Sequence, residues 1–236
     1  MLLSIVLPTY NERENIQRLI PAIERMLKQQ KLKAEIIVVD DSSPDGTAAA
    51  SRQIGKRYGN VRIIVRPKKE GIGAALHQAY DAAKGDIILS MDVDSLGPET
   101  IPKLVNKLNE GYDYVNGDRG TFGSWCKNRG MEGFTKECLS IAGNGLLRIL
   151  FGAPLSQFTM NCRAFTRSSW RSITIKEKGN IFLIEMIVAM KKQGVRIAQV
   201  PVQFTDRKHG LSKMRLGIES IRFIRVLGRL VWEYRF

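Results

Sequence analysis

Residues 86–94 read DIILSMDVD, an apolar run that ends in two aspartates, Asp92 and Asp94, separated by one valine. A short run of mostly apolar residues predicts a strand that is buried on both faces. We expect this strand to span residues 86–91 and the two carboxylates to stand at its carboxyl end. Ligands of parallel sheets bind at that end of the strands, so the Asp-x-Asp is the first candidate site.

Similar apolar runs recur along the chain and alternate with amphipathic segments. The other predicted strands span residues 3–7, 35–39, 61–65, 112–116 and 196–204. The predicted helices span residues 12–29, 47–58, 71–84, 98–109, 127–151, 180–193 and 214–236, and Asn11 is placed to cap the first of them. This alternation predicts an α/β fold, with a mostly parallel sheet that helices cover on both faces.

Polar residues follow the predicted strands and would meet at one edge of the sheet. They read PTYNE at 8–12, DD at 40–41, DVD at 92–94 and GDR at 117–119. Asp40, Asp41 and Asp45 lie within six residues, where their like charges repel. Either a ligand or cation offsets that repulsion, or the three side chains form Asx turns and cap the next helix.

Asp92 and Asp94 have the residue type and spacing of a divalent-cation site. Hard cations such as Mg²⁺ and Mn²⁺ take carboxylate oxygens and often share a substrate diphosphate. For an isolated Asp-x-Asp, a solvated turn is the alternative. Gly71 and Gly73 open a predicted helix, and the amino end of such a helix is a second candidate for phosphate binding.

The composition excludes a disordered chain and localises the excess charge. The 236 residues are 44% hydrophobic and 25% charged, which is an ordinary globular balance. The net charge is +14, and residues 163–236 carry 16 Lys and Arg against 5 Asp and Glu. A basic region of this kind indicates either an anionic partner or a solvated basic surface. No aromatic-rich basic motif occurs, so we expect no nucleic-acid partner.

The expected compartment and membrane topology follow from the apolar runs, the first residues and the number of cysteines. No run of 18 apolar residues occurs, so we expect no membrane-spanning helix. The first residues predict a strand and not a signal peptide. Three scattered cysteines indicate a reducing compartment, so we expect the protein on the cytoplasmic side of a membrane.

The basic region contains a loop and an amphipathic helix. In the loop 207–213, Arg207 and Lys213 could clamp phosphate. The helix 214–236 has two open interpretations. Its arginines could meet lipid headgroups while an apolar set enters the bilayer surface, namely Ile218, Phe223, Leu227 and Trp232. Alternatively, its apolar face packs on the domain or on a partner's membrane helix.

In order and spacing, these motifs resemble the dolichol-phosphate mannosyltransferases, which belong to the inverting glycosyltransferases of the GT-A fold. The matching motifs are PTYNE (8–12), VDDSSPDGT (39–47), DVD (92–94) and RKHGLSK (207–213). The segment 182–213 narrows the resemblance to the polyprenyl-phosphate branch, and to its short members without transmembrane segments. The resemblance implies a Rossmann-like GT-A catalytic domain over residues 1–213, with a mixed, mostly parallel sheet. Residues 214–236 would form a basic helix facing the membrane surface or a partner.

The resemblance also implies a role for each motif residue. The residues expected around the nucleoside of a nucleotide-sugar are Pro8, Tyr10, Glu12, Val39 and Asp41. Asp92, Val93 and Asp94 would meet the ribose and the diphosphate, with Asp92 and Asp94 as ligands of Mg²⁺ or Mn²⁺. The basic residues expected on the acceptor phosphate are Arg119, Arg207 and Lys213, and with Asp94 they form the expected catalytic set.

The implied reaction is transfer of mannose from GDP-mannose to dolichyl or polyprenyl phosphate, with inversion, at the cytoplasmic face of a membrane. A small membrane-anchoring subunit is an implied partner. Leu96, Gly120 and Gln157 depart from the family's pattern on the sugar and acceptor side. The alternatives are therefore transfer from a UDP-sugar to polyprenyl phosphate or to a glycan hydroxyl, or a paralogue that binds the nucleotide-sugar without turnover.

Overall fold

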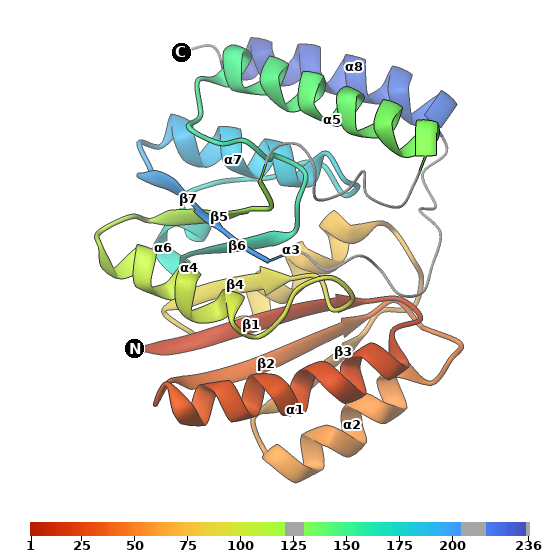
Figure 1. The fold of residues 1–236 in the computed structure, drawn as a ribbon, viewed down its shortest axis with the longest axis vertical. Helices are drawn as coiled ribbons and strands as arrows, with labels where there is room; N and C mark the ends of the chain where they lie inside the picture. The colour runs from red at the N-terminus through yellow and green to blue at the C-terminus, as the bar shows by residue number, and fades with distance from the viewer. Residues whose placement is uncertain (121–129, 204–215, 235–236) are drawn as a thin grey trace.

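A computed structural model describes residues 1–120, 130–203 and 216–234, and the strands in these ranges form one seven-stranded sheet (Figure 1). The strands are β1 (Leu2–Thr9), β2 (Lys33–Asp40), β3 (Val61–Val65), β4 (Ile87–Met91), β5 (Tyr114–Asp118), β6 (Cys162–Thr166) and β7 (Ile197–Pro201). Their order in the sheet is β3-β2-β1-β4-β6-β5-β7. Neighbouring strands are parallel except where β6 pairs with β4 and β5. The predicted mixed, mostly parallel sheet is confirmed.

Every predicted strand and helix is present, with ends that differ by a few residues. The helices are α1 (Arg13–Gln29), α2 (Thr47–Tyr58), α3 (Ile72–Ala82), α4 (Thr100–Asn109), α5 (Gly130–Phe151), α6 (Arg167–Arg171), α7 (Phe182–Lys192) and α8 (Leu216–Glu233). The structure adds β6 and α6, which the sequence did not predict. Among the described helices, none is both long and apolar enough to cross a bilayer.

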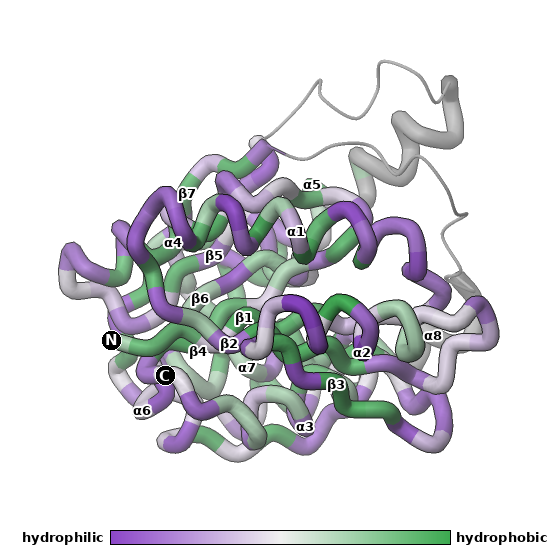
Figure 2. Tube along the Cα trace, turned by 90° about the horizontal axis from the view of Figure 1, so that it is seen from below, coloured by the Kyte–Doolittle hydropathy of each residue, from purple (hydrophilic) through white to green (hydrophobic). Residues whose placement is uncertain are grey.

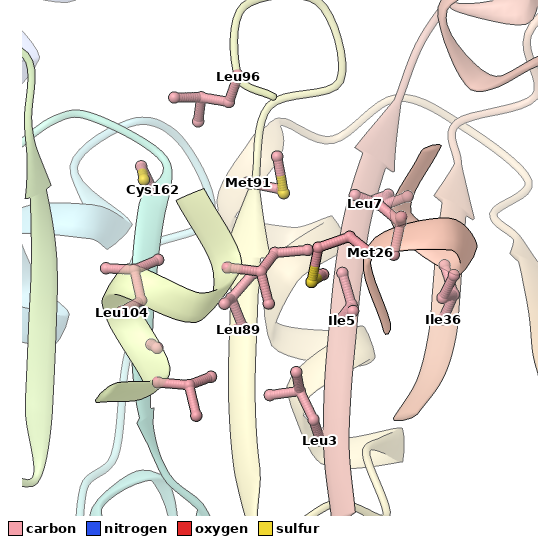
Figure 3. Close-up of a cluster of buried hydrophobic side chains, with 14 of the residues drawn as sticks. Leu3, Ile5, Leu7, Met26, Ile36, Leu89, Met91, Leu96, Leu104 and Cys162 are labelled. Carbon is pink, nitrogen blue, oxygen red and sulfur yellow. The ribbon is translucent and has the colours of Figure 1, made fainter. Parts of the chain in front are cut away.

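Successive side chains of the central strands point to opposite faces of the sheet and are apolar on both, which explains why helices cover both faces. On β1, Leu3, Ile5 and Leu7 point into a cluster shared with α1 and α4, whereas Val6 joins a cluster shared with α3 and α7. Figure 3 shows the first cluster, with Leu89 of β4 among the β1 side chains. Figure 2 shows the hydrophobic strands at the centre of the molecule. Since both faces are apolar, the sheet is stable only when it is covered on both sides.

Helix α7 is buried from its first residue to Met190, and this position explains its composition. Residues 182–190 are all buried, including Glu185. In Figure 1, α7 lies between the sheet and the pair α5 and α8. A helix that is apolar on all sides requires such an enclosed position.

In the part of α8 whose side chains the structure describes, the apolar face packs on the domain, which favours the second interpretation of this helix. Leu230 is fully buried, and Phe223 and Leu227 pack against the cluster around α7. Arg229 anchors the helix through ion pairs of 3.0 Å to Glu177 and 3.2 Å to Glu185. Phe223 and Leu227 are partly buried in this contact, which favours packing on the domain over insertion into a bilayer for these two side chains. Trp232 is 77% exposed, and the side chain of Ile218 lies outside the described residues.

The glycines at the start of α3 serve helix packing and do not form a phosphate cradle. A Cβ on Gly73 would lie 2.8 Å from the carbonyl oxygen of Gly179 and would overlap the Cβ of Phe182. Gly71 has a φ of 104°, and the backbone N–H of Ala74 donates to the carbonyl of Lys178. The amino end of α3 is thus in contact with the segment before α7, and the phosphate hypothesis for these glycines is wrong.

Candidate active site

The carboxyl ends of β1, β2 and β4 lie side by side because these strands are neighbours in the sheet. Thr9 is in register with Asp40, and Val6 with Ser90. Strand β6 runs antiparallel to β4, so its beginning lies beside the end of β4 and brings Asn161 to the same edge. The predicted convergence of polar strand ends is therefore present, with one segment added by β6.

Asp92 and Asp94 stand directly after β4 with half-buried side chains. The valine between them is 7% exposed and packs in the core cluster, which fixes the backbone of the turn. The N–H of Asp92 donates to the carbonyl of Asn161 at 3.1 Å. The Asn161 amide nitrogen also donates to Asp92 Oδ1 at 3.1 Å. The turn after β4 is therefore held by core packing and by hydrogen bonds to Asn161, and it presents the two carboxylates at the sheet edge.

This pair of carboxylates fits a magnesium-type ion better than a closed metal site. Carboxylate oxygens are hard donors, and Mg²⁺ usually takes one or two of them and completes its shell with water and substrate phosphates. Within the described ranges no cluster of three or more His, Cys, Asp or Glu side chains could hold a metal by itself. Asp92 and Asp94 are thus the residues that would bind the ion together with a substrate diphosphate.

The Cys162 thiol takes no part in chemistry at this edge. Cys162 is buried directly beside the end of β4 and belongs to the core cluster. Burial raises the pKa of its thiol to about 12, so the sulfur stays protonated and unreactive at neutral pH.

The acidic cluster after β2 makes protein contacts, which favours the turn-and-cap interpretation for two of its members. Asp40 is fully buried and accepts from the Thr9 hydroxyl at 3.1 Å and from the Ser43 N–H at 2.9 Å, closing an Asx turn. Asp45 accepts from the N–H groups of Arg13 at 3.0 Å and Thr47 at 2.9 Å. One carboxylate thus caps both α1 and α2.

Asp41 has a different partner, which no sequence pattern indicated. Its Oδ1 lies 2.6 Å from the guanidinium of Arg66, which is only 4% exposed and also contacts Glu70 at 2.9 Å. Burial raises the pKa of Asp41, against the opposing effect of the neighbouring Arg66 charge. Arg66 follows β3 at the same sheet edge, so the rule that places polar strand ends together could have found it.

The cap of α1 corrects a further expectation. Asn11 lies at a φ of 60° and is not the cap, because Glu12 occupies the N-cap position. The N–H groups of Glu12 and Arg13 instead donate to Thr47 and Asp45, which come from the next helical segment. The first helix is therefore capped by tertiary contacts that no local sequence pattern encodes.

Replacing Asp45 with asparagine is expected to lower the free energy of unfolding at pH 7 by about 1 kcal/mol, because the amide has only one acceptor oxygen and cannot accept from both the Arg13 and the Thr47 N–H groups. Burial acts to raise the pKa of Asp45, but hydrogen bonds from Thr47 and Arg13 together lower it below 3.8. Its stabilisation is therefore present above that pH and is lost as the pH falls through the lowered pKa. Urea unfolding should show the difference between wild type and Asp45→Asn shrinking below about pH 4.

The control is Glu14→Gln, which neutralises a carboxylate in the first turn of α1 that is 72% exposed and 3.9 Å from Arg18. We expect this exposed substitution to change stability by less than about 0.5 kcal/mol. Equal stability of Asp45→Asn and wild type at pH 7 would show that Asp45 is not a cap.

The residues expected around a nucleoside lie at this edge in different environments. Pro8 is half-buried near the end of β1, and Tyr10 follows that strand with the Lys69 ammonium 3.8 Å from its ring centre. The Glu12 carboxylate accepts from the Asn15 amide at 2.6 Å. The Val39 side chain is fully buried in the core, and its carbonyl accepts from the Thr9 hydroxyl.

The residues expected on the acceptor phosphate are only partly described. Arg119 follows β5 and is half-buried, with its guanidinium 3.4 Å from the Ser140 hydroxyl of α5. Arg207 and Lys213 lie outside the described residues. Gln157, which departs from the family's pattern on the acceptor side, is buried, and its backbone carbonyl accepts from the side-chain amide of Asn116 on β5 at 2.8 Å. No sequence pattern indicated Asn116.

This strand order and this acidic edge define a GT-A fold, and solved structures share it. One is glucosyl-3-phosphoglycerate synthase from Mycobacterium tuberculosis in complex with Mn²⁺, UDP and phosphoglyceric acid. Its TM-score is 0.74 at 24% identity, over 98% of this chain and 78% of that one. The same enzyme in complex with Mn²⁺ and UDP-glucose gives a TM-score of 0.73 at 25% identity, and the match covers 98% of this chain and 79% of that one. It has also been solved with Mg²⁺ and UDP.

Family membership follows from sequence similarity. Residues 4–169 match Glycosyl transferase family 2, and the chain belongs to it. It is 31% identical over 240 residues to dolichol-phosphate mannosyltransferase from Pyrococcus furiosus, which covers 99% of this chain and 65% of that protein. It is also 31% identical over 218 residues to polyprenol monophosphomannose synthase from Mycolicibacterium smegmatis. This match covers 89% of this chain and 80% of that protein. The chain thus spans slightly less than two thirds of the Pyrococcus relative, and the resemblance to these mannosyltransferases is confirmed.

Proposed function

We propose that this protein is a metal-dependent inverting glycosyltransferase that moves mannose from GDP-mannose to dolichyl or polyprenyl phosphate. The observation that carries the proposal is the Asp-x-Asp after β4, whose two carboxylates stand on a fixed turn at the ligand-binding edge of the sheet. The two mannosyltransferase relatives support the choice of donor sugar and lipid acceptor.

Each expected residue then has a chemical task. The nucleoside would lie among Pro8, Tyr10, Glu12, Val39 and Asp41. Asp92 and Asp94 would bind Mg²⁺ or Mn²⁺, which when present supplies charge stabilisation for the departing diphosphate. Val93 would meet the ribose through its backbone, because its side chain is buried. The acceptor phosphate would be attracted by Arg119, Arg207 and Lys213.

A phosphate acceptor explains why the reaction needs no general base. A phosphate monoester is already ionised near pH 7, with a second pKa of about 6, whereas a sugar hydroxyl must lose a proton as it reacts. One acceptor phosphate oxygen forms a bond to the anomeric carbon while the bond from that carbon to the diphosphate oxygen breaks. GDP leaves with the electron pair, and the configuration at the anomeric carbon inverts.

The lipid acceptor requires contact with a membrane, and we infer peripheral attachment at its cytoplasmic face. Helix α5 exposes Leu146, Ile149 and Leu150 to solvent, at 50%, 82% and 39%. Exposed Arg148 on the same helix could approach anionic headgroups while the apolar side chains enter the interface. A small membrane-anchoring subunit is a further proposed partner.

A second candidate is transfer from a UDP-sugar, and the solved structure with bound UDP-glucose at 25% identity is the observation that favours it. Sugar transfer to a glycan hydroxyl would need a general base on the acceptor side, unlike transfer to a phosphate. A paralogue that binds the nucleotide-sugar without turnover would keep the Asp-x-Asp and give no product.

A donor panel tests the proposal. Purified protein with Mg²⁺ or Mn²⁺ is given GDP-mannose, UDP-glucose or UDP-galactose, each with polyprenyl phosphate, with polyprenol and without lipid. We expect lipid-linked sugar only from the combination of GDP-mannose and polyprenyl phosphate. Product from a UDP-sugar would establish the second candidate. Donor binding in calorimetry without product from any combination would establish the binding-only paralogue.

A further inference from the structure

A chain of buried hydrogen bonds runs from the interior to Asp92. The Tyr80 hydroxyl lies 2.6 Å from the Ser90 hydroxyl, and Ser90 lies 2.8 Å from Asn161 Oδ1. The Asn161 amide nitrogen lies 3.1 Å from Asp92 Oδ1. The exposed fractions of Tyr80, Ser90 and Asn161 are 1%, 0% and 2%. Three separate elements thus contribute to one polar network: α3, β4 and the residue before β6.

The ionised carboxylate sets the direction of every bond in this chain. Asp92 can only accept, so the amide nitrogen of Asn161 faces it and the amide oxygen faces Ser90. Ser90 therefore donates its proton to Asn161, and it can accept the proton of the Tyr80 hydroxyl. Each of the three side chains has one orientation that satisfies its neighbours, so the network has a single arrangement.

The far end of the network is packed among buried aromatic rings. The Tyr80 ring contacts Phe165 and Trp170 edge-on, with ring centroids 5.0 Å and 5.1 Å apart. Asn161 is additionally fixed through its main chain, because its carbonyl accepts from the Asp92 N–H. The position of Asp92 Oδ1 is therefore tied to the packed core by a continuous set of contacts.

We propose that Asn161, supported by Ser90 and Tyr80, is a positioning residue that fixes the orientation of the Asp92 carboxylate for a divalent cation. The proposal rests on the proposed function, in which Asp92 is a ligand of that cation. Groups that hydrogen-bond to a ligating carboxylate typically change metal affinity by about 10- to 100-fold when they are removed. None of the three side chains need touch the metal or the substrate.

Metal binding measured without turnover tests the proposal. Free Mn²⁺ is quantified by electron paramagnetic resonance during titration of the protein with Mn²⁺ in the presence of GDP. Asn161→Ala is expected to weaken Mn²⁺ binding by about 10- to 100-fold. Tyr80→Phe removes only the distant hydroxyl and is expected to weaken it by about two- to tenfold.

Tyr114→Phe is the matched control. Tyr114 is also a fully buried tyrosine near Phe165, but its hydroxyl donates to Asn116 at 3.1 Å, away from Asp92. This variant is expected to bind Mn²⁺ as the wild type does. Thermal unfolding of all variants identifies any that fail to fold, and Ser90→Thr, which keeps the hydroxyl, should retain more affinity than Ser90→Ala.

The outcomes separate this inference from the proposed function. Wild-type affinity in both Asn161→Ala and Tyr80→Phe would overturn the positioning role while leaving the proposed function intact. Equal weakening by Tyr80→Phe and Tyr114→Phe would also overturn it, since any lost hydroxyl would then have the same effect. Failure of the wild type to bind Mn²⁺ with GDP would overturn both.

Discussion

Asp94→Asn is expected to lower sugar transfer by about a thousandfold while leaving the fold intact. The substitution keeps the shape of the side chain and removes the charge that would bind the cation. A cation contributes several kcal/mol to stabilising the charge of the departing diphosphate, and each 1.36 kcal/mol is a factor of ten in rate. Asp92→Asn should have a comparable effect, because both carboxylates leave the same turn after β4.

The control for this prediction is Asp86→Asn, at the opposite end of the same strand. Asp86 is exposed and accepts from the N–H of Leu2 at 2.9 Å. We expect this variant to keep wild-type turnover. Rates are measured as lipid-linked product over time at saturating Mn²⁺, with circular dichroism to verify folding. Wild-type turnover in Asp94→Asn would refute a cation site at the Asp-x-Asp.

Gly73→Ala is expected to destabilise the protein by about 3 kcal/mol or more, or to prevent folding. The added methyl group would overlap the Cβ of Phe182 and press on the carbonyl of Gly179. Phe182 is the first residue of buried α7 and Gly179 lies directly before it, so neither atom can move aside without shifting that helix. Urea unfolding measures the loss.

Gly143→Ala is the matched control, since it makes the same change inside α5, where no described atom lies within 4 Å of the added Cβ. It should be neutral or raise the free energy of unfolding by about 0.5–1 kcal/mol, because alanine favours a helix interior. If Gly73→Ala were as stable as Gly143→Ala, the tight contact between α3 and α7 would be disproved.

The parallel part of the fold could be predicted because its signals are local. Strands β1, β2 and β4 each contain an apolar run, and a polar residue at or directly after the end of each strand is brought to one edge of the sheet. The Asp-x-Asp was found in this way. Arg66 follows β3 at the same edge and could have been found by the same rule.

Strand β6 could not be predicted because its sequence, CRAFT, contains an arginine where a buried strand should be apolar. Arg163 is nevertheless fully buried, with its guanidinium donating to the carbonyls of Met160 and Leu183. One acceptor lies just before the strand and the other lies in α7, so only the folded chain explains how this arginine can be buried. Asn161 precedes this unpredicted strand, and for that reason its contact with Asp92 was also missed.

The most direct test of the proposed reaction is the structure of its lipid product. GDP-mannose carries the sugar in the α configuration, so attack by the lipid phosphate from the opposite face yields a β-linked mannosyl phosphodiester. Proton and phosphorus nuclear magnetic resonance of the purified lipid should show a β-anomeric proton coupled to a single phosphorus. An α-linked product, or mannose attached to anything other than the lipid phosphate, would contradict inverting transfer to a phosphate acceptor.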